Sequence, residues 1–192
     1  MNDFYFYFQL GWNHIISIEA IDHLLFITVL TSLYHMSQWK QVLSLITAFT
    51  IGHSLTLVLS SLSIVRFNSN VTEFLIPLTI LLTGIFNILQ NETNHAIIRL
   101  NYTLALLFGL IHGMGFANSI RFMLASHQQI AFPLFSFNLG IEAGQILLVL
   151  TLLFVGLVIT DVMGLKQKNW KFLLSVSSGL AAMYLCMIRW PF

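Results

Sequence analysis

Charged residues are scarce in this 192-residue chain. Only 8% of its residues are Asp, Glu, Lys or Arg, whereas a soluble globular domain carries about 25%. The formal net charge is only +1, so the chain lacks the basic surface that nucleic-acid recognition requires. The single cysteine, Cys186, excludes an internal disulfide. These absences together exclude a soluble domain and a nucleic-acid-binding protein.

The sequence consists largely of long apolar runs. The chain is 57% hydrophobic, and a membrane-spanning helix needs about 20 apolar residues. We predict six such helices, at residues 20–36, 42–65, 71–90, 102–124, 131–160 and 170–191. The connections between them are too short for a soluble domain, so residues 1–192 form a single transmembrane domain.

The first 19 residues have a different character. They are aromatic, but Gly11, Asn13 and His14 interrupt the apolar pattern, which favours an interfacial or re-entrant segment. The predicted fold is therefore an all-α integral membrane protein, a six-helix transmembrane bundle with such a segment at its N-terminus.

The distribution of basic residues predicts the orientation of this bundle. One side of the predicted bundle collects Lys40, Arg99, Lys166, Lys168 and Lys171, and the other collects Arg66, Arg121 and Arg189. Because lysine and arginine favour the cytoplasmic side of a membrane protein, the richer side is predicted to be cytoplasmic. Both termini then lie outside.

Ionisable residues inside the apolar runs are the most informative feature of the chain. His53 and His112 each lie in the middle of a predicted span, Asp22 and His23 open the first span, and Glu142 lies within the fifth. An ionisable group in hydrocarbon is costly and marks a functional site unless it has a partner. Counting residues along each span places all five at a similar depth, in the outer half of the membrane, which favours one shared site.

Imidazole and carboxylate are the ligands of a borderline divalent cation, and the identity of that cation, nickel, zinc or cobalt, stays open. The predicted metal ligands are Asp22, His23, His53, His112 and Glu142. Four polar residues are predicted to support these ligands: Ser54, Asn138, Gln145 and His14. Asn138, Glu142 and Gln145 have the spacing i, i+4 and i+7, which places them on one helix face.

Three functions fit this set of residues. The first is a divalent-metal permease. The second is an intramembrane zinc-dependent hydrolase of a lipid or membrane-anchored substrate, since three histidines and a carboxylate can hold zinc and leave a position for water. The third is a non-catalytic subunit whose polar contacts join its helices, at about 0.6–2 kcal/mol each. The residues alone leave open whether the chain is an enzyme. Its predicted partners are the lipid bilayer and a metal ion, and a second copy of the chain is a further candidate.

Four segments carry a resemblance to a known family. They are DHLLF at 22–26, TAFTIGHSLTL at 47–57, FGLIHGMGFA at 108–117 and FNLGIEAGQ at 137–145. With these segments the chain resembles the HupE/UreJ family, and specifically its second subgroup. Members are small bacterial membrane proteins found as hydrogenase or urease accessory proteins.

This resemblance implies a multi-pass protein of the bacterial inner (cytoplasmic) membrane with a proposed role in nickel or cobalt permeation. It also implies that Asp22, His23, His53, His112 and Glu142 are the functional positions. Two positions differ from the family pattern. Ala20 stands where the family has glycine, and His14 lies farther from the Asp-His pair than the upstream histidine of the family does.

Overall fold

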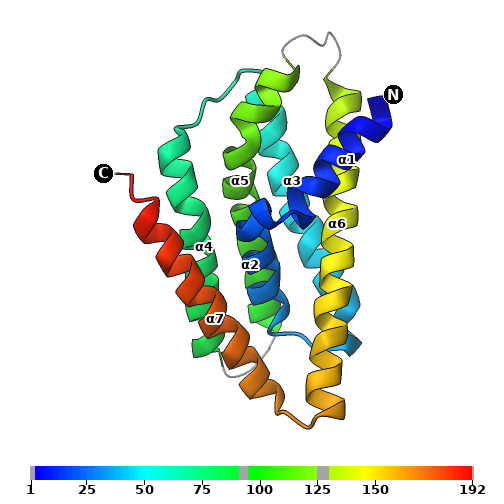
Figure 1. Cartoon of the computed structure of the whole chain (residues 1–192), viewed down its shortest axis with the longest axis vertical. Coiled ribbons are helices and arrows are strands. Elements are labelled where there is room, and N and C mark those ends of the chain that lie inside the picture. The colour runs from blue at the N-terminus through cyan, green and yellow to red at the C-terminus, as the bar shows by residue number, and fades with distance from the viewer. Residues whose placement is uncertain (1–2, 91–94, 125–129, 192) are drawn as a thin grey trace.

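The computed structural model describes residues 3–90, 95–124 and 130–191, and for residues 95–99, 118, 121, 122 and 124 it describes the backbone only. Every regular element in these ranges is helical (Figure 1). In chain order the elements are α1 (Asp3–Ile16), η1 (Ile18–Ala20), α2 (Ile21–Thr31), η2 (Met36–Gln38), α3 (Trp39–Ser61), α4 (Ser69–Leu89), α5 (His95–Leu124), α6 (Ala131–Leu157), η3 (Val158–Val162) and α7 (Gln167–Ile188).

Five of these helical segments are long and apolar enough to cross a membrane, and a sixth span is formed if the bent pair of α1 and α2 is counted as one. The predicted all-α membrane bundle is therefore confirmed. In Figure 1, α4 and α7 form one side of the bundle and α6 forms the other, with α3 and α5 between them. α2 lies in front of α5, near the centre of the molecule.

The N-terminal pair of helices is bent in its middle, as in a broken span or a re-entrant loop. α1 and the helical segment Ile18–Thr31 meet at an angle of 56°, and Ser17 between them has extended backbone angles (φ −65°, ψ 152°). α2 alone has 11 residues and is only about 17 Å long, because an α-helix rises 1.5 Å per residue. Since the hydrocarbon core is about 30 Å thick, α2 cannot cross it without α1.

The first 19 residues, which the sequence predicts to be an interfacial or re-entrant segment, lie against the bundle. α1 is packed against the bundle, with Tyr7, Gly11 and Ile15 buried. It crosses α6 obliquely in Figure 1. Gly11 faces the backbone of Phe137, and Gly140 faces the backbone of Phe8, so two glycines allow these helices to approach closely. The segment is therefore packed into the bundle and its end reaches the protein interior, as a re-entrant segment or one half of a broken span would.

The first predicted span also ends earlier than its sequence indicates. Residues 20–36 were predicted as one helix, but α2 ends at Thr31. Asn87 of α4 donates from its amide nitrogen to the carbonyl of Val29 at 2.7 Å and to the hydroxyl of Ser32 at 3.1 Å. The first of these hydrogen bonds satisfies a backbone carbonyl that a continuing helix would have satisfied itself. No local sequence signal, such as Gly or Pro, marks this end.

α3 and α5 form the closest helix pair in the centre of the bundle. Added Cβ atoms on Gly52 and Gly109 would collide with the carbonyl oxygens of Leu106 and Phe49, respectively. A Cβ on Gly113 would lie 2.6 Å from the carbonyl oxygen of His53. The two helices therefore approach backbone to backbone, which brings His53 of α3 close to the turn of α5 that carries His112.

Candidate metal centre

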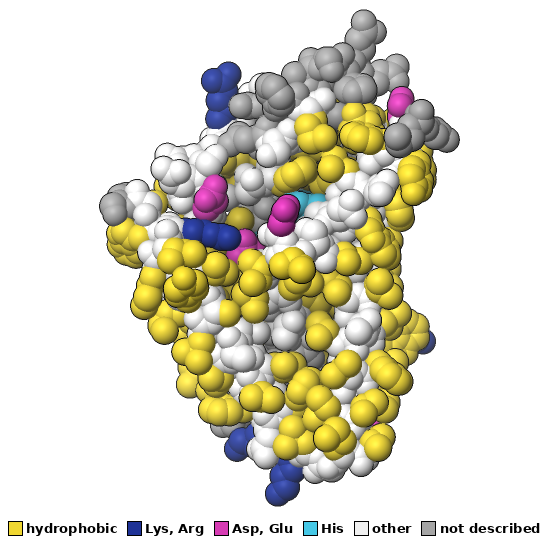
Figure 2. Space-filling view, in the orientation of Figure 1, with side chains coloured by type: hydrophobic (Ala, Val, Ile, Leu, Met, Phe, Trp, Pro, Cys, Tyr) yellow, Lys and Arg dark blue, Asp and Glu magenta, His cyan; other side chains and the backbone are white. Residues whose placement is uncertain are grey.

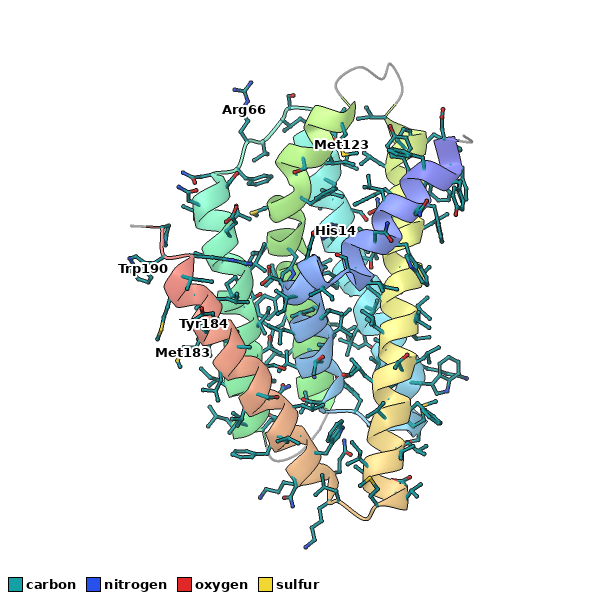
Figure 3. The ribbon with its side chains drawn as sticks, viewed as in Figure 1. His14, Arg66, Met123, Met183, Tyr184 and Trp190 are labelled. Carbon is teal, nitrogen blue, oxygen red and sulfur yellow. The ribbon has the colours of Figure 1, made fainter. Side chains whose placement is uncertain are left out.

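Four histidine side chains lie together in the interior of the bundle. They are His14 in the last turn of α1, His23 in the first turn of α2, His53 in α3 and His112 in α5. Their ring centres are 4.7 Å apart for His14 and His23, 5.3 Å for His23 and His112, 5.8 Å for His14 and His53, and 6.0 Å for His23 and His53. Figure 3 shows His14 between α1 and α5. The break at Ser17 brings the first two histidines together, and the glycine contacts of α3 and α5 bring in the other two.

These separations are those of imidazoles around one ion. With each nitrogen about 2.1 Å from a tetrahedral metal, neighbouring ring centres lie about 5 Å apart. The nitrogens themselves are not yet aimed at one point. Among the described residues, no group of three or more His, Cys, Asp or Glu side chains is already placed to hold an ion. Binding therefore requires these imidazoles to rotate about their side-chain bonds.

The histidine nitrogens are buried and largely unpaired. His23, His53 and His112 have exposed fractions of 7%, 0% and 1%. Five buried ring nitrogens in the cluster have no hydrogen-bond partner: His14 Nε2, His23 Nε2, both nitrogens of His53, and His112 Nδ1. Buried polar atoms are nearly always paired, and each exception calls for an explanation such as a bound ion or water. A cation at the cluster would satisfy these lone pairs.

His112 differs from the other rings in that one of its nitrogens has a partner. Its Nε2 lies 3.2 Å from the hydroxyl oxygen of Thr79 in α4. That hydroxyl donates its only proton to the carbonyl of Ile76 at 2.7 Å, so the Thr79 oxygen accepts the proton of Nε2. The other nitrogen, Nδ1, then carries the lone pair and faces no other partner. A hydrogen bond to the second nitrogen is the usual way in which a protein orients a metal-binding histidine.

A cavity of about 700 Å³ leads to this cluster from one side of the molecule. His14, His23 and His112 line its inner end. Its charged lining residues are Glu19, Asp22, Glu73 and Arg189. Figure 2 shows acidic, basic and histidine side chains gathered around a hollow in the upper half of this face, in a surface that is otherwise largely hydrophobic. The cavity therefore offers a cation an acidic route to the imidazoles.

Asp22 links the acidic wall to the cluster, because it directly precedes His23 in the first turn of α2. Its Oδ2 accepts a hydrogen bond from Arg189 Nη1 at 2.8 Å, and this ion pair is largely buried. Its other oxygen, Oδ1, is buried without a hydrogen-bond partner. One carboxylate oxygen is thus engaged by a cationic side chain, while the other is free to accept a ligand.

Aromatic rings pack around the cluster. The ring of Phe116 lies 4.4 Å from that of His14, and the rings of Phe26 and Phe49 each lie 5.1 Å from that of His112. Phe26 and Phe49 are also stacked on one another at 4.9 Å. These rings exclude water, which makes electrostatic interactions at the cluster stronger than in solution.

Glu142 has a different environment from the other predicted ligands. Its Oε1 accepts a hydrogen bond from Thr47 of α3 at 2.9 Å, and it is not among the residues that line the cavity. One turn farther along α6, Gln145 accepts from Thr50 at 2.7 Å. Two parallel hydrogen bonds thus join α6 to α3. As placed, Glu142 supports the helix that carries His53.

The remaining predicted supporting residues occupy separate places. Asn138 of α6 has a buried Oδ1 without a hydrogen-bond partner. Ser54 follows His53 on α3 and is half-buried. His14, predicted as a supporting residue, lies within the cluster and contacts His23 and His53. The structure therefore brings together His14, His23, His53 and His112, with Asp22 in the wall of the same cavity.

Sequence reasoning missed several residues of the site. Thr79 was not named, Arg189 was considered only for the orientation of the bundle, and Glu73 was not among the predicted ligands. Glu73 is near a helix start, and its contribution to the cavity depends on how α4 packs. Arg189 is separated from Asp22 by 167 positions, so no local pattern predicts their contact. For the position of His14 within the cluster, the only signal in the sequence was the interruption of the apolar pattern around it.

Comparison with known proteins supports the family resemblance over the whole chain. The model of a family described as HupE / UreJ protein matches residues 1–191. None of the curated proteins and none of the solved structures compared matches the chain. The family is associated with nickel or cobalt uptake or with accessory functions. Because this match extends over residues 1–191, the chain belongs to the HupE/UreJ family.

Proposed function

We propose that this protein binds a divalent transition-metal cation at the four-histidine cluster and conducts it across the membrane. The observation that carries the proposal is the cluster itself: buried imidazoles from four helix positions, with unpaired nitrogens, at the end of an acid-lined cavity. Family membership supports nickel or cobalt as the cargo.

The donor set argues for a borderline cation. Neutral imidazole binds nickel, cobalt, zinc and copper well, whereas magnesium and calcium prefer oxygen ligands. Asp22 Oδ1 adds one anionic oxygen near the cluster. The only cysteine, Cys186, does not line the cavity. The site therefore favours nickel, cobalt or zinc over both the hard cations and the thiolate-bound metals.

A transport route needs polar groups beyond the cluster, and α4 supplies them. Thr79, Thr83 and Asn87 are buried and spaced i, i+4 and i+8, so they lie on one face of the helix. Thr79 contacts His112, and Asn87 contacts Ser32 at the end of α2. We infer that a cation leaving the imidazoles moves along this face. The stacked rings of Phe26 and Phe49 close the inner side here, so a conformational change must accompany release.

The distribution of charge supports an outward-facing cavity. Lys40, Lys166, Lys168 and Lys171 belong to the starts of α3 and α7, which lie at the end of the bundle opposite to the N-terminus in Figure 1. If that end is cytoplasmic, both termini and the cavity face the outside of a bacterial inner membrane. The cavity would then collect the cation from the outer side.

Metal binding by purified protein tests the proposal. We expect wild-type protein in detergent to bind nickel, cobalt or zinc in calorimetric titration, with bound metal measured by mass spectrometry. His53→Ala and His112→Ala should each weaken binding at least about 100-fold, because each removes a buried ligand. His35→Ala is the matched control, since His35 pairs with Asp161 away from the cavity. Equal binding by all four proteins would contradict the proposal.

A zinc-dependent hydrolase is the second candidate, and one observation favours it. The cavity reaches the cluster from one side, while aromatic rings close the other, and a one-sided site suits an enzyme that acts on a lipid or membrane-anchored substrate. Zinc held there would activate a water molecule, and Asp22 or Glu142 would be the candidate base. Cation flux into proteoliposomes separates the two functions. Flux that is lost in His53→Ala supports the permease, whereas tightly bound zinc that never crosses supports the hydrolase.

A further inference from the structure

Arg189 forms an ion pair with Asp22, the carboxylate next to the histidine cluster. Arg189 Nη1 lies 2.8 Å from Asp22 Oδ2, and the two side chains have exposed fractions of 25% and 16%. Both residues line the cavity. The contact joins the C-terminal end of α7 to the first turn of α2. Asp22 is therefore neutralised by a cation that belongs to the protein itself.

The position of Arg189 allows its guanidinium group to move. Arg189 is the first residue after α7, outside the helical backbone. The next residue, Trp190, packs edge-on against Phe74 of α4 with ring centres 5.1 Å apart, and Figure 3 shows Trp190 at this end of α7. The backbone is thus anchored at Trp190, while the long side chain of Arg189 can leave Asp22 without unfolding a helix.

The charges of the cavity match a divalent cation. Its three acidic lining residues, Glu19, Asp22 and Glu73, contribute three negative charges, and Arg189 contributes one positive charge. The sum is −2, with the histidines neutral. A divalent ion that replaces Arg189 on Asp22, with the guanidinium group still inside the cavity, would neutralise this sum, and it would also gain imidazole ligands that a guanidinium group cannot use. A monovalent ion would gain less, because sodium and potassium bind imidazole poorly.

We propose that Arg189 is a tethered cation that holds Asp22 until a transition-metal ion displaces it. This inference rests on the proposed metal-binding function. While the ion pair is closed, Asp22 Oδ2 is not available to sodium, potassium or magnesium. An ion that also binds the imidazoles can replace the guanidinium group. Arg189 therefore lowers the affinity of the site for every cation and increases its selectivity for imidazole-binding ones.

Nickel affinity of the intact protein tests the displacement. Arg189→Gln keeps a polar side chain but removes the competing charge, so we expect nickel to bind about ten-fold tighter than to wild type. Excess magnesium should also weaken nickel binding more in Arg189→Gln than in wild type. Arg66→Gln is the matched control, because Arg66 is exposed on the connection between α3 and α4, at the upper end in Figure 3. Unchanged or weaker nickel binding by Arg189→Gln would overturn the proposal.

A second measurement follows the ion pair directly. Phenylglyoxal modifies free guanidinium groups, and mass spectrometry identifies the peptide that contains Arg189. We expect slow modification in metal-free wild type, and several-fold faster modification in Asp22→Asn and after addition of nickel to wild type. Equal rates in wild type and Asp22→Asn would show that the ion pair does not protect Arg189, and would overturn the proposal while metal binding stands. If Asp22 protects Arg189 but neither wild type nor Arg189→Gln binds any of the three metals, the metal-binding function fails and the displacement fails with it.

Discussion

Each imidazole of the cluster has two nitrogens, and the partner of one determines what the other can do. For His112 the assignment follows from a single hydroxyl, because Thr79 gives its proton to Ile76 and must accept from His112 Nε2. His53 has no such partner on either nitrogen. Of these two rings, His112 is thus the one whose orientation a hydrogen bond fixes, whereas no hydrogen bond fixes that of His53.

The role of Thr79 can be tested by removing its hydroxyl. Thr79→Val should lower the affinity for nickel about ten-fold, since loss of a hydrogen bond that orients a metal-binding histidine costs 10–100-fold. Thr79→Ser should restore most of the affinity, because the hydroxyl returns. Thr151→Val serves as the control, since Thr151 bonds only to its own helix on an exposed face of α6. Calorimetric titration measures all four proteins, and equal affinities would contradict the assignment of the ring nitrogens.

At the scale of elements, the site depends on a broken helix and on one close helix pair. The break between α1 and α2 places two histidines nine positions apart in sequence within 4.7 Å of each other. In a lipid bilayer, irregular backbone is tolerated where it is buried in protein or lines a cavity, and Ser17 at the break lines this one. The α3–α5 pair contributes the other two histidines through glycine contacts. Neither pair of histidines would meet if these helices were straight and widely spaced.

Gly113 gives a direct test of the helix pair. A Cβ at this position would lie 2.6 Å from the carbonyl oxygen of His53, so Gly113→Ala must push α3 away from α5. We expect a loss of about 1–3 kcal/mol in the free energy of unfolding, which is typical of overpacking, together with weaker metal binding. Gly179→Ala is the control, because its Cβ would meet only Leu81 Cδ1 at 3.9 Å. Thermal unfolding in detergent compares the two variants. Equal melting temperatures would contradict the close approach of α3 and α5 at Gly113.

At the scale of the whole molecule, the two ends of the bundle differ in charge and in shape. The acidic cavity opens in the upper half, and dark blue lysine or arginine side chains project at the lower end in Figure 2. The hydrophobic surface around both regions suits contact with lipid, as expected for helices that cross a bilayer. Under the proposed function, this asymmetry places cation entry at the end opposite to the lysines.

Cysteine labelling can determine this direction. In a Cys186→Ser background, Arg66→Cys and Lys166→Cys place one thiol at each end, and both positions are exposed. With the cavity facing outward, a membrane-impermeant maleimide should label Arg66→Cys in intact spheroplasts. It should label Lys166→Cys only after the membrane is permeabilised. The reverse pattern would place the cavity in the cytoplasm and contradict uptake from outside.

The membrane class, the helical fold and most of the chemistry follow from local composition. Apolar runs of sufficient length must be helical in a bilayer, because their backbone groups have no other partners there. Buried ionisable residues are equally visible, since His53 and His112 interrupt such runs. This local reasoning failed for residues 20–36, because the end of α2 depends on Asn87 in another helix.

By itself, the sequence determined that polar residues lie at membrane depth and that imidazole dominates them, because hydrophobicity and donor chemistry are properties of individual residues. Only the tertiary structure decided which of these residues meet. It brought His14 into the cluster, directed Glu142 to Thr47 and placed Arg189 against Asp22. Contacts of this kind depend on helix bends and backbone approaches between distant segments, and no pattern within one segment records them.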